Sequence, residues 1–194
     1  RHPAHHRGTS RLSPRAYLAT TGRILRQLAA DRRSVAMILV VPRAVITLMY
    51  FMFHNVPTRP GVPSPFNTAC LILLGLFPLF VMFLITSITM QRERASGTLE
   101  RILTPPLRRL DLLAAYGTAF SIAAAAQAML ACVVCFWLLG FDTQGSPVWV
   151  FVIAVLNAVL GVGLGLLASA FARTEFQAVQ FMPVFIVPQL LLAG

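Results

Sequence analysis

The sequence predicts an all-α fold, a polytopic bundle of transmembrane helices. The chain of 194 residues is 57% hydrophobic and only 11% charged, where a soluble domain carries about 25% charged residues. Five apolar runs are long enough to cross about 30 Å of hydrocarbon, which takes about 20 helical residues. None alternates apolar and polar residues as a membrane β-barrel strand does. We expect spans at about 34–53, 66–90, 112–139, 148–172 and 176–194.

The placement of arginine predicts the orientation of the chain. All 16 basic residues are arginine, and alternate segments outside the spans hold fourteen against one. Because cytoplasmic loops keep their positive charge, the amino terminus is expected in the cytoplasm of a multi-pass protein of the cell (plasma) membrane. No nucleic acid is expected as a partner, since a nucleic-acid binder spreads its cations along a solvated face.

Three regions follow from the pattern along the chain. Residues 1–13 are basic and lack periodicity, which indicates a disordered tail. Residues 14–33 carry one apolar stripe opposite arginines, which predicts an interfacial connecting helix lying on the bilayer surface. The stripe consists of Tyr17, Leu18, Thr21, Ile24, Leu25 and Leu28. Residues 34–194 form the transmembrane domain. Because the chain stops inside an apolar run, we expect a longer protein with a sixth span.

The loop after the second predicted span has its own amphipathic pattern. A short helix is expected at about residues 96–104, because Pro105 and Pro106 end it. Its apolar side is expected to enter a partner's groove, with Glu93, Glu100 and the arginines of the loop at the rim. The alternative is that this helix merely lies on the bilayer. The apolar side consists of Leu99, Ile102 and Leu103.

A family resemblance rests on this loop. The string ERASGTLERILTPPLRRLDLLAAYG, which begins at Glu93, resembles the signature of the ABC-2 type family of transporter membrane subunits. RILRQLAADRRSVAMILVVP, from Arg23, resembles the family's connecting helix and first span, and QAVQFMPVFIVPQLLLAG, from Gln177, resembles its fifth span. The resemblance covers about residues 15–194. The chain departs from the pattern at Ala95 and Ser96, where many relatives carry a further charge.

The resemblance implies a six-helix permease that pairs with a second permease subunit, the same or homologous, and with two cytoplasmic ABC ATPase subunits. The helix at 96–104 would be the coupling helix that sits on the ATPase. The residues assigned to this coupling are Glu93, Gly97, Thr98, Leu99, Glu100, Ile102 and Leu103. The chain has no lysine, so it cannot form a lysine-dependent P-loop. We therefore expect no enzyme activity and no cofactor in this chain, with ATP and Mg bound by the partner ATPase.

The implied function is export of a hydrophobic or amphipathic substrate, such as a drug or lipid, by alternating access. Aromatic and polar side chains of the second and fifth spans are candidates for the pathway, with lipid-facing aromatics as the equally weighted alternative. They are Phe77, Phe80, Phe83, Gln180, Phe181 and Phe185. An ion-coupled secondary transporter or channel is the rival function, which the lack of acids deep in the spans disfavours. A membrane enzyme ranks lowest, because no H-E-x-x-H or G-x-S-x-G motif is present.

Polar and small residues in the spans predict helix packing. Gln127 and Asn157 fall at similar depths, and we expect them to hydrogen-bond across neighbouring helices. Gly161 and Gly165, with Ser169, form a ladder of small residues, for which the alanines at 123–126 are the expected opposing surface. The three cysteines lie inside apolar stretches, where they are expected to be small buried residues without a metal or redox role.

Overall fold

The structure, a computed structural model, describes residues 14–97, 109–140 and 145–193 and confirms the predicted all-α fold. Within these ranges the chain forms helices and no strand. Four helical segments are long and apolar enough to cross a membrane: Arg32–Phe53, Pro65–Ala95, Asp111–Leu138 and Pro147–Phe171. The helices are α1 (Pro14–Ala30), α2 (Arg32–Leu39), α3 (Val41–Phe53), α4 (Pro65–Ala95), α6 (Arg109–Val133), the π-helix η1 (Val134–Leu138), α7 (Pro147–Phe171) and α8 (Glu175–Ala193).

The first span is built from two helices. Asp31 caps α2, because its carboxylate accepts hydrogen bonds from the backbone N–H of Arg33 at 3.1 Å and the hydroxyl of Ser34 at 2.7 Å. Pro42 follows the junction between α2 and α3, where its missing N–H leaves a carbonyl of the preceding turn without its usual donor. The guanidinium of Arg43 donates to the carbonyl of Leu39 in that turn. Arg43 therefore reaches back toward the amino-terminal end of its span, the direction expected of a side chain that snorkels.

The fifth predicted span corresponds to α8. This helix has 19 residues and contains Pro183 and Pro188, and at 1.5 Å per residue it is about 28 Å long. Its start forms one half of the T-x-x-Q capping box that Thr174 and Gln177 offer, while the Gln177 side chain binds one residue earlier than in a full box. The backbone N–H of Gln177 donates to the hydroxyl of Thr174 at 3.1 Å, and the side-chain oxygen of Gln177 accepts from the backbone N–H of Arg173 at 2.8 Å.

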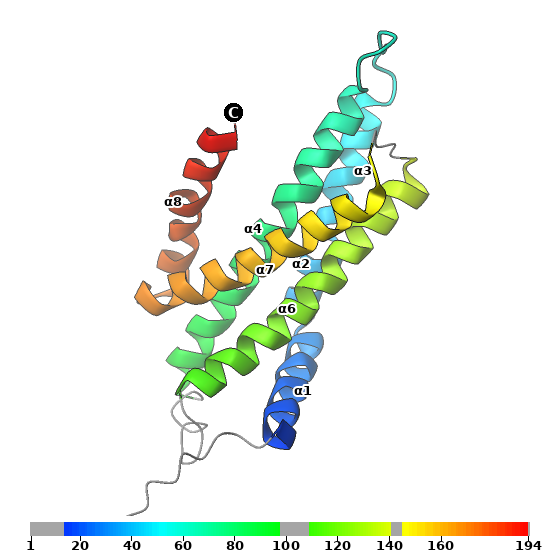
Figure 1. The fold of residues 1–194 in the computed structure, drawn as a ribbon. Helices are drawn as coiled ribbons and strands as arrows, with labels where there is room; N and C mark the ends of the chain where they lie inside the picture. Colours follow the sequence, from blue (N-terminus) through cyan, green and yellow to red (C-terminus); the bar gives the residue numbers. More distant parts are fainter. Residues whose placement is uncertain (1–13, 98–108, 141–144, 194) are drawn as a thin grey trace, which may run out of the picture.

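Helix α7 crosses α4 at close range (Figure 1). A Cβ atom added to Gly161 would lie 2.4 Å from the carbonyl oxygen of Leu79, and one added to Gly165 would lie 2.8 Å from that of Phe83. The ladder of small residues therefore does allow a close approach, but the prediction that it faces the alanines at 123–126 is wrong. The partner is the backbone of α4.

The predicted bond between Gln127 and Asn157 is also wrong. The Asn157 amide donates instead to the backbone carbonyl of Gly75 in α4 at 2.9 Å. Gln127 is 1% exposed, and among the described residues neither its amide nitrogen nor its amide oxygen has a hydrogen-bond partner. Similar depth does not decide which neighbour a side chain meets, because the rotation of each helix about its own axis also matters.

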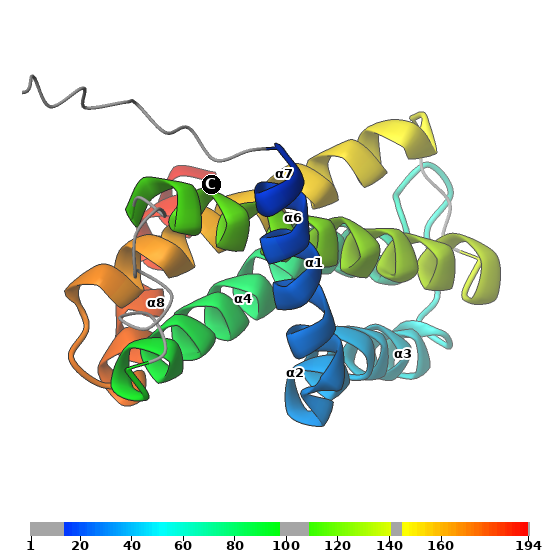
Figure 2. The ribbon, with the colours of Figure 1, turned by 90° about the horizontal axis from the view of Figure 1, so that it is seen from below.

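The two ends of the bundle differ. At one end, which we call the α1 end, α1 packs on the first turns of α6 and is hydrogen-bonded to the last turn of α4. The loop between α3 and α4 lies at the opposite end (Figure 1). Seen from the α1 end, α1 lies in front of α6 (Figure 2). One buried cluster joins α1, α4, α6 and α7 near this end, and a second joins α3, α4, α6, η1 and α7 near the other.

Candidate functional site

Helix α1 packs on the bundle instead of lying only on lipid. Of its predicted apolar stripe, Thr21, Ile24 and Leu28 are buried, whereas Leu18 is 67% exposed. The hydroxyl of Tyr17 hydrogen-bonds with the hydroxyl of Thr118 in α6, and that hydroxyl donates to the carbonyl of Ala114 at 2.8 Å. The predicted apolar face is thus largely buried against the bundle, and its position at the bilayer surface stays a prediction. An apolar stripe shows that a face is covered and does not show what covers it.

The last turn of α4 binds three different helices through three consecutive side chains. The amide of Gln91 is buried and donates to the carbonyls of Ser169, at 3.0 Å, and Ala172, at the end of α7. Arg92 forms an ion pair with Glu175 at the start of α8, with 2.9 Å between Nε and Oε1. Glu93, the third, faces α1. These contacts make the end of α4 the common attachment point of the helices around it.

Glu93 is bound to the connecting helix. Its side chain is 5% exposed, and its Oε1 accepts a hydrogen bond of 2.7 Å from Nε2 of Gln27 in α1. A hydrogen bond to a charged group contributes about 1.5–3 kcal/mol. The sequence placed Glu93 on the solvated rim of the docking helix, which is wrong: the carboxylate is buried inside the α1 end. Because α4 continues to Ala95, Glu93 belongs to α4 and not to the helix predicted at residues 96–104.

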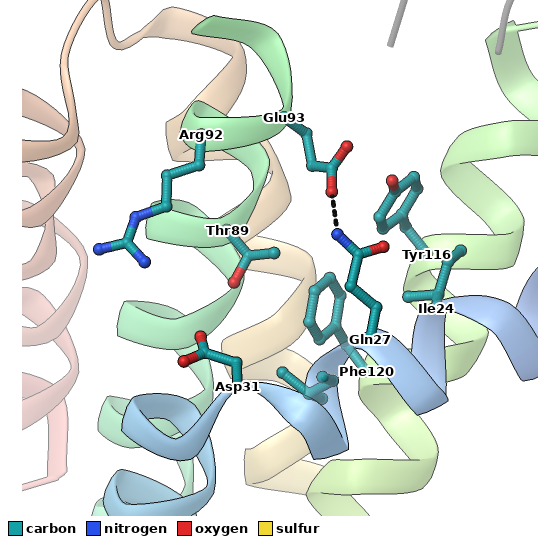
Figure 3. Close-up of a pocket in the computed structure, with 9 residues that line it drawn as sticks. Ile24, Gln27, Asp31, Thr89, Arg92, Glu93, Tyr116 and Phe120 are labelled. Atoms are coloured by element: carbon teal, nitrogen blue, oxygen red, sulfur yellow. Dashed lines mark hydrogen bonds between the residues drawn. The ribbon is translucent and has the colours of Figure 1, made fainter. Parts of the chain in front are cut away.

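A cavity of about 180 Å³ surrounds this carboxylate (Figure 3). Tyr116, which is 1% exposed, lies beside the pair of Glu93 and Gln27, and neither its hydroxyl nor Oε2 of Glu93 has a hydrogen-bond partner among the described residues. The volume is far above the 10–15 Å³ or so that one water needs, so the cavity itself can hold water. The lining residues are Ile24, Gln27, Leu28, Asp31, Thr89, Arg92, Glu93, Tyr116 and Phe120.

A second cavity, of about 420 Å³, lies between α2, α4 and α8 at the same end and shares Asp31, Thr89 and Arg92 with the first. The pKa of Asp31 is lowered, mainly because the hydroxyl of Ser34 hydrogen-bonds to its carboxylate. The carboxylate of Asp31 therefore stays charged at neutral pH. No group of three or more His, Cys, Asp or Glu residues in the described ranges is arranged to hold a metal ion.

The loop that begins at Gly97 continues directly from this turn. Gly97 has a φ of +67°, a left-handed conformation that a residue with a Cβ adopts only with strain. The hydrogen bond from its N–H to the carbonyl of Arg94, at 3.2 Å, lies at the end of α4. The other coupling residues of the sequence prediction lie outside the described residues: Thr98, Leu99, Glu100, Ile102 and Leu103. Their role stays a prediction.

The predicted pathway residues are divided between core and surface. Phe83 of α4 is fully buried, and its ring centroid lies 6.0 Å from that of Phe185 in α8. Phe77 packs against the buried cluster near the α1 end. Phe80 and Phe181 are half-buried, and Gln180 is exposed. The structure thus brings one aromatic pair together across α4 and α8, while a pathway stays a prediction.

Comparison with known proteins agrees with this architecture. Residues 15–194 match the family described as ABC-2 type transporter. The chain belongs to the ABC-2 type transporter family. With its long apolar helices, this makes it a multi-pass membrane protein. The polar residues of this candidate site that the sequence did not single out are Gln27, Gln91 and Arg92. Gln91 and Arg92 directly precede the family motif that begins at Glu93.

Curated relatives of this ABC-2 type chain are permeases. It is 29% identical over 122 residues to the probable multidrug ABC transporter permease YbhR of Escherichia coli K12, which covers 63% of this chain and 33% of the relative. It is 29% identical over 122 residues to the linearmycin resistance permease protein LnrN of Bacillus subtilis 168, which covers 62% of this chain and 31% of the relative. The chain thus spans about a third of the length of the curated relatives it matches. No solved structure matches it significantly.

Proposed function

We propose that this chain is the membrane-spanning permease part of an ATP-driven ABC exporter. The match of residues 15–194 to the ABC-2 type family carries the proposal. The partners are two ABC ATPase subunits, which bind ATP and Mg, and a second permease subunit that is the same or homologous. The chain contains no lysine and so lacks the lysine of a P-loop. Energy from ATP therefore comes from another chain or from a domain outside these residues.

The α1 end is the proposed cytoplasmic end, where the ATPase acts on the loop between α4 and α6. The arginines in this loop and in α1 support that orientation. Force on the loop reaches the last turn of α4 first. The contacts of Gln91, Arg92 and Glu93 with α7, α8 and α1 support transmission from there, because a displaced turn must either move these helices or break the contacts.

The proposed movement is alternating access. A packed helical interface has few stable arrangements, so a small displacement at one end switches helices between them instead of bending them gradually. In the proposed cycle, ATP binding draws the two ATPase subunits together and the coupling helices move with them. The spans that the coupling helices adjoin then tilt, and a cavity between the two permease subunits changes the side on which it opens.

The proposed substrate is hydrophobic or amphipathic, a drug or a lipid. The names of the relatives, which refer to multidrug transport and linearmycin resistance, support this class. The pathway is proposed along α4 and α8, where Phe83 and Phe185 approach each other. Large aromatic surfaces suit apolar cargo, since burial of apolar area supplies most of the binding free energy and requires no fixed geometry.

The test is co-purification followed by transport. The full-length protein purified in mild detergent is expected to carry a stoichiometric ATPase with Walker motifs. In vesicles, Leu99→Glu combined with Ile102→Glu is expected to abolish substrate export while ATP hydrolysis continues. Thr104→Glu, on the opposite side of the predicted helix, is the matched control and is expected to keep export. A stable complex without any ATPase would instead favour the ion-coupled transporter or channel.

A further inference from the structure

Two cysteines meet at the end of the bundle opposite α1. Cys70 lies five residues into α4, and Cys135 lies in η1, the π-helix that follows α6. Both side chains are 0% exposed and belong to the same buried cluster. Their sulfur atoms are 3.0 Å apart, and both are free thiols in this structure. Two sulfur atoms in ordinary van der Waals contact lie farther apart, and a covalent S–S bond measures about 2.05 Å.

The third cysteine gives a built-in comparison. Cys132 is also buried, at 7% exposed, and belongs to the same cluster. Among the described residues, the sulfur atom of Cys70 lies within hydrogen-bond distance of the sulfur of Cys135 and not of the sulfur of Cys132. Cys135 lies in the π-helix η1, which begins at Val134, whereas Cys132 lies in α6. The N–H of Leu139 bonds to the carbonyl of Val134, five residues earlier, at 3.1 Å. Such π-segments are rare and occur frequently at functional sites.

We propose that Cys70 and Cys135 form a disulfide that joins the start of α4 to the end of the α6 and η1 unit. It rests on the proposed orientation, which places this end of the bundle toward the outer face, where disulfides form and persist. The two residues are 65 positions apart in the chain, so the bond closes a long loop that spans two membrane crossings. It fixes these two helices to each other at the end far from the proposed ATPase contact.

The oxidant is a disulfide-bearing thiol oxidoreductase of the outer face. The thiolate of one cysteine attacks the disulfide of the oxidoreductase, which forms a mixed disulfide and releases one thiolate of the oxidoreductase. The thiolate of the second cysteine then attacks the sulfur of the first, which forms the Cys70–Cys135 bond and releases the second thiolate. Two protons leave the cysteines, and two electrons pass to the oxidoreductase. Because both sulfurs are buried in the folded chain, the exchange takes place before α4 and η1 pack.

The test counts free thiols in the full-length protein purified without reductant. The protein is denatured in N-ethylmaleimide, and peptides are identified by mass spectrometry before and after reduction. Before reduction, the modified cysteine of this region is expected to be Cys132, and a peptide pair linked through Cys70 and Cys135 is expected. After reduction all three cysteines react. Free Cys70 and Cys135 before reduction, or a link from Cys70 to Cys132, would overturn the proposal.

Variants and a topology measurement separate the causes. Cys70→Ser is expected to release Cys135 for modification, whereas Cys132→Ser, the matched control, keeps the linked peptide pair. If Cys70→Ser fails to fold, the wild-type measurement still decides. The orientation is read separately from the protease accessibility of an epitope inserted between α3 and α4. Reduced thiols in a correctly oriented, transport-competent protein would overturn the disulfide and leave the proposed transport function standing.

Discussion

The contact between α7 and α4 allows a quantitative test with a control two residues away in the same helix. An alanine Cβ at position 161 would lie 2.4 Å from the carbonyl oxygen of Leu79, about 1 Å short of ordinary van der Waals contact, and the obstacle is backbone. At Gly163 a Cβ would meet nothing within 4 Å. Both substitutions gain about the same in helix propensity, up to about 1 kcal/mol. The two variants therefore differ in packing alone.

We expect Gly161→Ala to destabilise the protein by about 1–3 kcal/mol, the usual cost of extra atoms in a packed core. Gly163→Ala is expected to be neutral or stabilising by up to about 1 kcal/mol. The assay is thermal unfolding of the purified full-length protein in detergent, followed by size-exclusion chromatography. At about 2–4 °C per kcal/mol for a domain of this size, the two midpoints should differ by several degrees. Equal midpoints would refute the close contact between α7 and α4.

Three further predictions follow from the polar contacts. A double-mutant cycle of Gln27→Ala and Glu93→Ala is expected to give a coupling energy of about 1–3 kcal/mol in unfolding experiments. Purely additive effects would show that this hydrogen bond does not couple α1 to α4. Asn157→Leu should destabilise the protein by about 0.6–1.7 kcal/mol, because the hydrogen bond from Asn157 to α4 is lost. Gln127→Leu should be neutral or stabilising, because the Gln127 amide has no partner among the described residues. A reversed order of the two melting points would contradict both expectations. The pKa of Asp31 is lowered in the folded protein, so the stability that its cap contributes is present above about pH 4 and is lost as the pH falls through the folded pKa. Asp31→Asn should cap equally well at pH 7 and should reduce this acid-induced loss of stability, measured by circular dichroism. An unchanged pH profile would exclude the cap as the source of the loss.

The sequence predicted the fold class well because apolar run length and the absence of strand alternation are strong signals in membrane proteins. It also predicted the buried face of α1. Those features depend on local periodicity and on residues only a few positions apart. They require no knowledge of which helix lies next to which.

Contacts between distant helices were not predictable in the same way. Asn157 bonds to the carbonyl of Gly75, and Gly161 faces the carbonyl of Leu79. Both contacts are with the backbone of α4, and because every helix has the same backbone, the sequence does not indicate which helix is the partner. The burial of Glu93 was missed for a related reason. Its partner Gln27 lies 66 positions earlier in the chain, and a surface glutamate and a buried one look identical in a sequence.

Photo-cross-linking tests the central claim most directly, which is that the loop between α4 and α6 is the contact for an ATPase. A photoreactive amino acid is introduced in place of Ile102 in the full-length protein, and in place of Thr58, in the loop at the opposite end, as the control. After irradiation of native membranes, we expect a covalent adduct between position 102 and a protein with Walker motifs, and no such adduct from position 58. Adducts from position 102 that contain only lipid, or the same products from both positions, would contradict the account.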